Sequence, residues 1–210
     1  MMRKITKKIL HIFLKILLIF VALDLLIVLL VFTPPVQKLI VNKVTNSISE
    51  TTKSKFIIQK IYITPTFRIK AIGVFIKDHH GNNMIAAQEL SGKLNIKKFS
   101  IHSIYLKDII IKKGDFVLRT YKGENTVNLN QWIYSFGRSK STEHFILHLK
   151  DVKLINSHFA VINDNTRSYS KNNTIDYGFF EFKNINASIK NFFVNGPEVS
   201  CQILQVSTEQ

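Results

Sequence analysis

The sequence predicts a mainly β protein that begins with two helices, and three observations support this. An apolar segment at 9–32 predicts a transmembrane helix, followed at 33–53 by a short amphipathic helix. After Thr51 the apolar residues recur with a period of two, which predicts strands of a curved, open, antiparallel-rich sheet, or β-groove. A pattern at 105–120 returns in looser form at 148–163, which predicts a repeated strand unit.

The composition is that of an ordered, strongly basic chain. Its 210 residues include 29 Lys and Arg against 14 Asp and Glu, a formal net charge of +15, and 46% of them are hydrophobic. The basic residues are spread evenly, which favours a solvated surface over a nucleic-acid site and leaves anionic lipid headgroups as an alternative partner. Cys201 is the single cysteine, so the chain has no intramolecular disulfide and its redox compartment stays open.

The first 32 residues predict a basic start at 1–8 and a membrane anchor at 9–32. As a helix the 24 residues of the anchor reach roughly 36 Å, enough for a bilayer core of about 30 Å. Asp24 costs about 3 kcal/mol there, less than the surrounding apolar residues return. A cleaved signal peptide is disfavoured, because the apolar run is too long for an ordinary h-region and no small-x-small site follows it. The residues that define the anchor are Ile16, Leu17, Leu18, Phe20, Asp24, Leu29 and Phe32. The cations that place the amino terminus in the cytoplasm are Arg3, Lys4, Lys7 and Lys8.

The segment 33–53 predicts a juxtamembrane helix. Pro34 and Pro35 end the preceding helix, because neither can donate a backbone hydrogen bond. Apolar residues then recur at spacings of three and four, at Val36, Leu39, Ile40, Val44 and Ile48. This face is expected to lie either on the membrane surface or against the next domain.

Two β units are expected after this helix. The first covers 54–136 and ends in a short helix at 128–136, which Asn128 can cap and in which Leu129, Trp132, Ile133 and Phe136 share a face. A polar linker at 137–143 follows. The second unit covers 144–210 and is expected to be incomplete.

The internal repeat carries the main functional expectation. Leu106–Arg119 and Leu149–Ile162 align over 14 positions with four identities, and in each copy the apolar phase slips by one at a Lys-Asp pair. Such a slip turns a strand over unless a bulge restores its face, so the repeat predicts a strand bent at a fixed place that keeps one apolar side. The residues expected to line a lipid groove are Ile104, Leu106, Ile109, Ile111, Phe116, Leu118, Leu147, Leu149, Val152, Leu154, Phe159 and Val161. Packing of the same side chains into a closed core is the alternative.

No arrangement of residues predicts catalysis, a metal or a cofactor. His79 and His80 follow Asp78 in a turn, but no third ligand stands at a fixed spacing. His144 and His148 are expected to be ordinary strand residues. Nucleotide-binding, hydrolase and zinc-protease motifs are not found in the sequence, so an enzyme is not expected.

Four stretches occur in an order that resembles the TamB and AsmA-like envelope proteins, in the form found in Bacteroidota-like genomes. They are TPPVQKLIVNKVTNSI, VFIKDHHGNNMIAAQELSGKLNI, IYLKDIIIKKGDFVLRT and NTVNLNQWIYSF, and they follow the basic start and the apolar segment. The resemblance implies the amino-terminal portion of a β-groove that is anchored in the inner membrane, lies mostly in the periplasm and carries phospholipid between membranes. It also implies an alternative role as a scaffold for outer-membrane β-barrel proteins, with a barrel partner of the BamA/TamA type. A plain membrane-anchored β domain that displays a binding surface is the third possibility.

Overall fold

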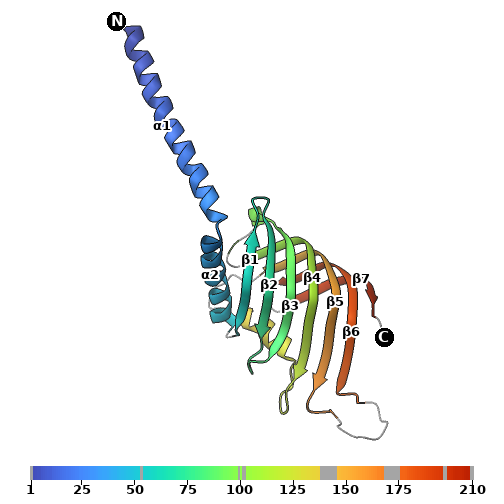
Figure 1. Ribbon diagram of the computed structural model, residues 1–210. Coiled ribbons are helices and arrows are strands. Elements are labelled where there is room, and N and C mark those ends of the chain that lie inside the picture. The colour runs from blue at the N-terminus through green and yellow to red at the C-terminus, as the bar shows by residue number, and fades with distance from the viewer. Residues whose placement is uncertain are drawn as a thin grey trace.

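The computed structural model describes residues 2–52, 54–98, 100, 103–137, 146–167, 176–195 and 198–208. Figure 1 shows a long helix that extends away from a curved sheet, with a second helix along one edge of that sheet. The helices are α1 (Met2–Val31), α2 (Pro34–Thr52), the short 3-10 helix η1 (Ile96–Lys98) and α3 (Asn128–Gly137). The strands are β1 (Phe56–Ile63), β2 (Arg68–Lys77), β3 (Asn83–Leu94), β4 (Ser103–Thr120), β5 (Ile146–Asn163), β6 (Phe179–Asn195) and β7 (Glu198–Ser207).

All seven described strands belong to one open sheet, in the order in which they occur in the chain. Neighbouring strands are antiparallel except β4 and β5, which are parallel. A parallel pair needs a crossover connection, and here that connection contains α3. The sheet agrees with the mainly β, curved and open architecture that the sequence predicts, and β4 with β5 joins the segments 54–136 and 144–210 in a single layer.

The predicted transmembrane anchor is wrong. Within the described residues, no helix combines the length and the apolar character that crossing a bilayer requires. Lys15 and Asp24 divide the apolar run of α1 and leave only 16–23 between them without a charge, and a charge near the middle of a spanning helix costs about 3 kcal/mol. The single-pass placement in the inner membrane is therefore corrected as well.

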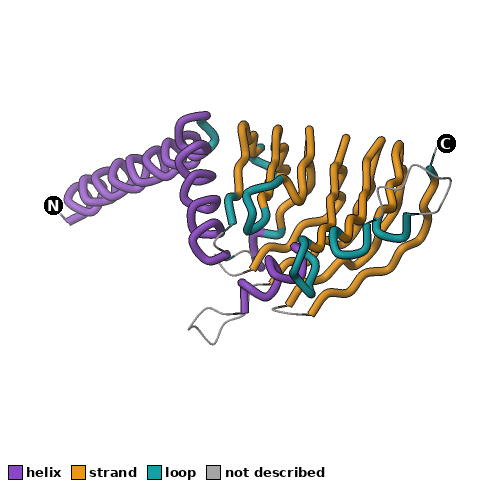
Figure 2. Tube along the Cα trace, turned by 90° about the horizontal axis from the view of Figure 1, so that it is seen from below, coloured by secondary structure: helices purple, strands orange, loops and turns teal. Residues whose placement is uncertain are grey.

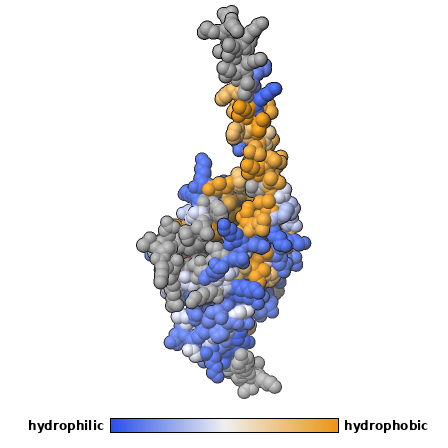
Figure 3. Space-filling model, turned by 90° about the vertical axis from the view of Figure 1, so that its left-hand side faces the viewer, coloured by the Kyte–Doolittle hydropathy of each residue, from blue (hydrophilic) through white to orange (hydrophobic). Residues whose placement is uncertain are grey.

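The residues assigned to the anchor and to its orientation lie in or beside α1. Side chains exposed along the helix are those of Ile16, Leu17, Leu18, Phe20, Asp24 and Leu29. Phe32 follows the helix, and its ring centroid lies 6.5 Å from that of Phe67. Arg3, Lys4, Lys7 and Lys8 are in α1, but their side chains lie outside the described part of the structure. In Figure 3 apolar surface runs along α1, whereas most of the surface below it is hydrophilic.

Helix α2 packs on β1 through a different face from the one that the sequence predicts. Gln37, Val41 and Thr45 are buried, while Leu39 and Ile40 are exposed. The Gln37 side chain donates to the Ile63 carbonyl at 2.8 Å and accepts from the Ile63 amide at 3.1 Å. The Gln37 side-chain amide thus makes the two hydrogen bonds at the end of the edge strand β1 that a neighbouring strand would otherwise make. This explains why a polar residue occupies the buried face of α2.

The long strands are bent rather than straight, as Figure 2 shows from below the sheet. One row of directly paired residues crosses β2, β3 and β4 at Val74, Ala87 and Gly114. The row continues in β5 and β6 with the directly paired Ser157 and Ile185. In four of the five strands the residue just before this row has a positive φ: Gly73 (63°), Lys113 (48°), Asn156 (49°) and Asn184 (52°). Left-handed residues and bulges re-aim a strand, so their alignment across neighbouring strands bends the whole sheet along one line.

Helix α3 begins at Asn128, the predicted capping residue. Its side chain is 1% exposed; the oxygen accepts from the Leu129 and Arg119 amides, and the nitrogen donates to the Val117 carbonyl and to Asp78. Strand β3 pairs with β4 only as far as Phe116. Asn128 therefore occupies the position beside β4 where the next β3 residues would be, and it fixes the start of α3 there.

Candidate functional site

The two copies of the sequence repeat lie side by side in the sheet. Strands β4 and β5 are parallel and pair at an offset of 43 residues, from Ser103↔Ile146 to Thr120↔Asn163. This is the offset at which the two copies align in the sequence. All twelve predicted lining residues therefore meet their own counterparts: Ile104↔Leu147, Leu106↔Leu149, Ile109↔Val152, Ile111↔Leu154, Phe116↔Phe159 and Leu118↔Val161.

Two bends keep these residues on one face of the sheet. In β4 the first lies at Asp108, which has a φ of 52°, opposite a register shift between Ser91 and Lys93. This bulge is at the Lys-Asp pair, where the apolar phase slips in the sequence. The second lies at Lys113 and Asn156, between Ile111 and Phe116 in one strand and between Leu154 and Phe159 in the other. Each slip of one residue would turn the strand over, and each bulge turns it back.

The apolar face continues into the neighbouring strands. Directly paired residues of an antiparallel sheet lie on the same face, and the β6 partners of the β5 lining residues are all apolar. These partners are Phe180, Phe182, Ala187, Ile189, Phe192 and Val194. Ile185, which pairs with Ser157, lies among them and is counted with them. In β7, Val199, Ile203 and Val206 pair with members of this set. We call the twelve residues of β4 and β5 together with these partners in β6 and β7 the apolar lining.

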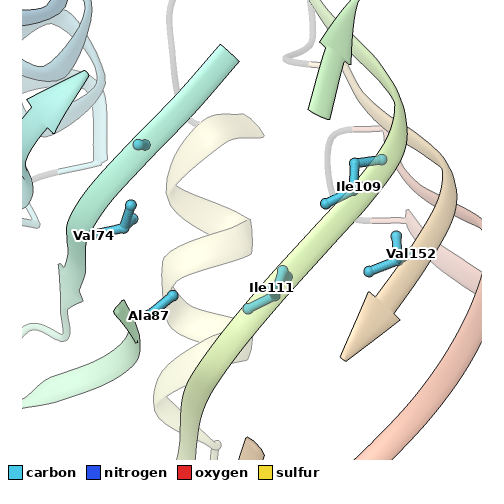
Figure 4. Packing of buried hydrophobic residues seen from close by; sticks show 6 residues of the cluster. Val74, Ala87, Ile109, Ile111 and Val152 are labelled. Atoms are coloured by element: carbon cyan, nitrogen blue, oxygen red, sulfur yellow. The ribbon is translucent and has the colours of Figure 1, made fainter. Parts of the chain in front are cut away.

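The burial of the apolar lining decreases from the middle of the sheet toward β7. Ile109 is 1% and Val152 4% exposed, and Figure 4 shows their side chains, with that of Ile111, in one cluster with Val74 and Ala87 of β2 and β3. This region has a packed core, which also contains Ala71, Val74 and Ala87. In contrast Phe182 is 48% and Ile203 64% exposed. The lining is thus closed at its centre and open to solvent at Phe180 and Phe182 of β6 and along β7, whereas Ile185 and Val194 of β6 are buried.

The opposite face of the sheet carries polar side chains that pair with one another. The carboxylate of Glu89 lies between the Nζ atoms of Lys70 and Lys112, at 2.9 and 3.0 Å. Hydrogen bonds from Lys70, the larger effect, and from Lys112 lower the pKa of this carboxyl. Tyr105, His148 and Phe193 stack edge to face across three strands. Charged and aromatic groups on this face make the two sides of the sheet chemically distinct.

His158 bridges two carboxylates on that opposite face. Its Nδ1 lies 2.6 Å from Asp115 and its Nε2 lies 3.0 Å from Glu181. Burial lowers the pKa of His158, but the hydrogen bonds to the two carboxylates outweigh it and raise that pKa above its usual value. The three residues line a shallow depression, together with Lys113 and Lys183 among others.

The four histidines considered in the sequence have different environments. His144 lies outside the described residues. His148 belongs to the aromatic stack. His79 and His80 lie in the turn between β2 and β3, and both rings contact the carboxylate of Glu124. Glu124 could not be predicted from the sequence, because it is 44 residues from His80 in the chain and no local spacing relates the two.

No known protein family matches the sequence, and no curated protein matches it either.

Proposed function

We propose that the apolar lining binds lipid acyl chains and that the protein takes part in phospholipid transfer between membranes. The observation that carries this proposal is the continuity of the lining across four strands together with its exposure at Phe180 and Phe182 of β6 and along β7. The resemblance to the TamB and AsmA-like proteins supports the same function.

The chemistry of the lining suits a hydrocarbon chain. Its side chains are aliphatic or aromatic at nearly every paired position, and the buried Ser157 hydroxyl is already engaged by the Gly114 amide at 3.2 Å. An acyl chain needs no hydrogen-bonding partner and gains about 0.8 kcal/mol for each methylene removed from water. Ten methylenes placed on the exposed part would therefore contribute up to about 8 kcal/mol before the entropy cost of ordering the chain.

The exposed end of the lining is where a lipid would enter. Phe180 and Phe182 in β6 and Val199, Ile203 and Val206 in β7 are between 45% and 64% exposed. Apolar surface of this extent is costly in water and commonly marks a binding site. The packed core around Ile109 then forms the closed end of the site.

A photocrosslinking experiment tests the proposal. Benzoylphenylalanine replaces Phe182, on the lining, or Phe193, which is on the same strand but faces His148 on the opposite side. We expect phospholipid adducts from position 182 and at least about tenfold fewer from position 193, because only the first contacts an acyl chain. Equal yields at both positions, or no lipid adduct at position 182 in protein incubated with phospholipid, would refute it.

A second candidate function is a scaffold for extended protein clients, and the edge strand β7 favours it. All ten residues of β7 are exposed, and in the described structure the strand pairs only with β6. An extended segment could add to this edge by backbone hydrogen bonds. Crosslinks from β7 to a barrel protein, without lipid adducts from Phe182, would favour this function over the first.

A further inference from the structure

Three potential metal ligands meet at one end of the sheet. His79 and His80 come from the turn between β2 and β3, and Glu124 comes from the loop that joins β4 to α3. The two His Nε2 atoms and a carboxylate oxygen all lie within 4.8 Å of one another. His79 Nε2 is 3.0 and 3.2 Å from the two Glu124 oxygens, and His80 Nε2 is 2.7 Å from Oε1.

We propose that His79, His80 and Glu124 bind a divalent transition-metal ion of the Zn²⁺ class. Two imidazole nitrogens and a carboxylate are ligands that such an ion prefers. In a tetrahedral site with bonds of about 2.0–2.1 Å, neighbouring ligand atoms are about 3.3 Å apart. The distances from His79 and His80 Nε2 to Glu124 Oε1, 3.0 and 2.7 Å, are shorter than this by a few tenths of an ångström, so a small outward movement of the carboxylate or the rings makes room for the ion. Water completes the coordination.

Metal binding exchanges protons for the ion without any other reactant. In the metal-free site each imidazole Nε2 lies within hydrogen-bond distance of the Glu124 carboxylate. The ion takes the Nε2 lone pairs, and each Nε2 proton leaves to solvent or is replaced by one on Nδ1.

The turn that carries the two histidines is held in place by Asp78. Its Oδ1 accepts from the backbone amides of His80 and Asn82, at 3.0 and 2.9 Å. Its Oδ2 accepts from the Tyr121 hydroxyl at 2.5 Å. The Tyr121 ring in turn packs on His80, with 3.9 Å between the ring centroids.

Glu124 is oriented from the other side. Gln131 of α3 donates to its Oε2 at 2.8 Å, and Asn165 donates to its backbone carbonyl at 2.8 Å. Outer contacts of this kind orient metal ligands and increase affinity. The side chains of His79 and His80 are 33% and 44% exposed, which leaves a path for the ion.

A bound ion would join two segments that the chain connects only through β3 and β4. It would fix the β2–β3 turn to the loop that leads into α3, and so hold α3 at the end of β4. We therefore expect the ion to raise the melting temperature of the protein by a few degrees, in the order of 2–6 °C when the ion is in large excess over its Kd.

The test uses the full chain without a polyhistidine tag. Co²⁺ alone serves as the spectroscopic probe, and Zn²⁺ is then titrated to displace it. We expect one Co²⁺ per chain with visible d–d absorption of low-symmetry coordination. Glu124→Gln and His80→Ala should each weaken binding at least about tenfold, while the matched control His148→Ala, in the aromatic stack, should bind as the wild type does.

Two outcomes would overturn the proposal. One is the absence of saturable Co²⁺ and Zn²⁺ binding at micromolar concentration. The other is unchanged affinity in Glu124→Gln, which would mean that exposed histidines bind the ion adventitiously. The near-ultraviolet circular dichroism of each variant shows whether it is folded. If a variant is unfolded, the conservative Glu124→Asp replaces it in the test. We expect Glu124→Asp to bind the ion more weakly than the wild type but measurably.

Discussion

Two amide side chains complete hydrogen bonding that the strands leave open. Gln37 pairs with both backbone groups of Ile63 at the end of β1, and Asn128 pairs with Arg119 and Val117 where β3 ends beside β4. An amide carries a donor and an acceptor at nearly the spacing of a peptide group. Each therefore substitutes for a missing strand residue and at the same time ties a helix to the sheet, α2 by Gln37 and α3 by Asn128.

His158 makes the stability of the protein depend on pH. The folded pKa of this imidazole is raised above the usual value of about 6.5. Its contribution is therefore fully present below that pH and is lost as the pH rises through the folded pKa. We expect His158→Gln to reduce the free energy of unfolding, measured by urea denaturation, more at about pH 5.5 than at about pH 8.5.

The two carboxylates that face His158 provide the control. In an Asp115→Asn background, where Glu181 still contacts the ring, the difference between the two pH values should become smaller. An equal effect of His158→Gln at both pH values would show that folding does not raise the pKa of the imidazole.

The bend of each long strand depends on a residue that accepts a positive φ. Asn156 has a φ of 49° and an exposed side chain, so a substitution there changes backbone strain without removing a buried group. A β-branched residue in this conformation costs about 1–2 kcal/mol, whereas glycine adopts it freely. We expect Asn156→Val to lower the free energy of unfolding by that amount and Asn156→Gly to change it by less than about 0.5 kcal/mol.

A second substitution in the same strand separates strain from strand propensity. Lys153 is also exposed but lies in the regular part of β5, between Val152 and Leu154. Lys153→Val should be neutral or slightly stabilising, because β-branched residues favour strands. If Asn156→Val and Lys153→Val had the same effect on urea denaturation, the bend would not depend on residue 156.

The pairing of the strands could be predicted from the sequence to a larger extent than the packing of the helices. The spacing of the repeat equals the β4–β5 register, and the slip at Lys107 and Asp108 marks a real bulge. Side-chain alternation is local, so a phase slip is visible in one sequence. That the copies pair in parallel is not visible, because the same spacing fits stacked hairpins.

The helices and the metal ligands depended on contacts that no local pattern shows. The predicted apolar face of α2 is wrong at Leu39 and Ile40, which are exposed. The buried face instead contains Gln37, because its side chain hydrogen-bonds to the backbone at the end of β1. Glu124 joins His79 and His80 only after β3 and β4 have folded between them. The periodicity of a short segment cannot predict either contact, since both depend on where strands that are distant in the sequence end.

The distribution of charge over the whole molecule leads to the last prediction. The chain has a net charge of +15, yet the apolar lining contains no charged side chain. Uptake of an acyl chain by the lining should therefore change by less than about twofold between about 0.05 and 0.5 M salt, although attraction to anionic vesicles is screened over that range. A fluorescent fatty acid without vesicles reports the first process, and co-sedimentation with anionic vesicles reports the second.

Two neighbouring residues of β6 distinguish these processes by mutation. Phe182→Asp places a charge on the lining and should reduce fatty-acid uptake at least about fivefold at either salt concentration, because a desolvated carboxylate opposes burial of the chain. Lys183 pairs with Glu181 on the opposite face. Lys183→Glu should therefore weaken vesicle attraction at low salt and leave fatty-acid uptake unchanged. If uptake fell with salt as steeply as vesicle binding, or if Lys183→Glu impaired it as much as Phe182→Asp, the lipid would be held by surface charge and not by the lining.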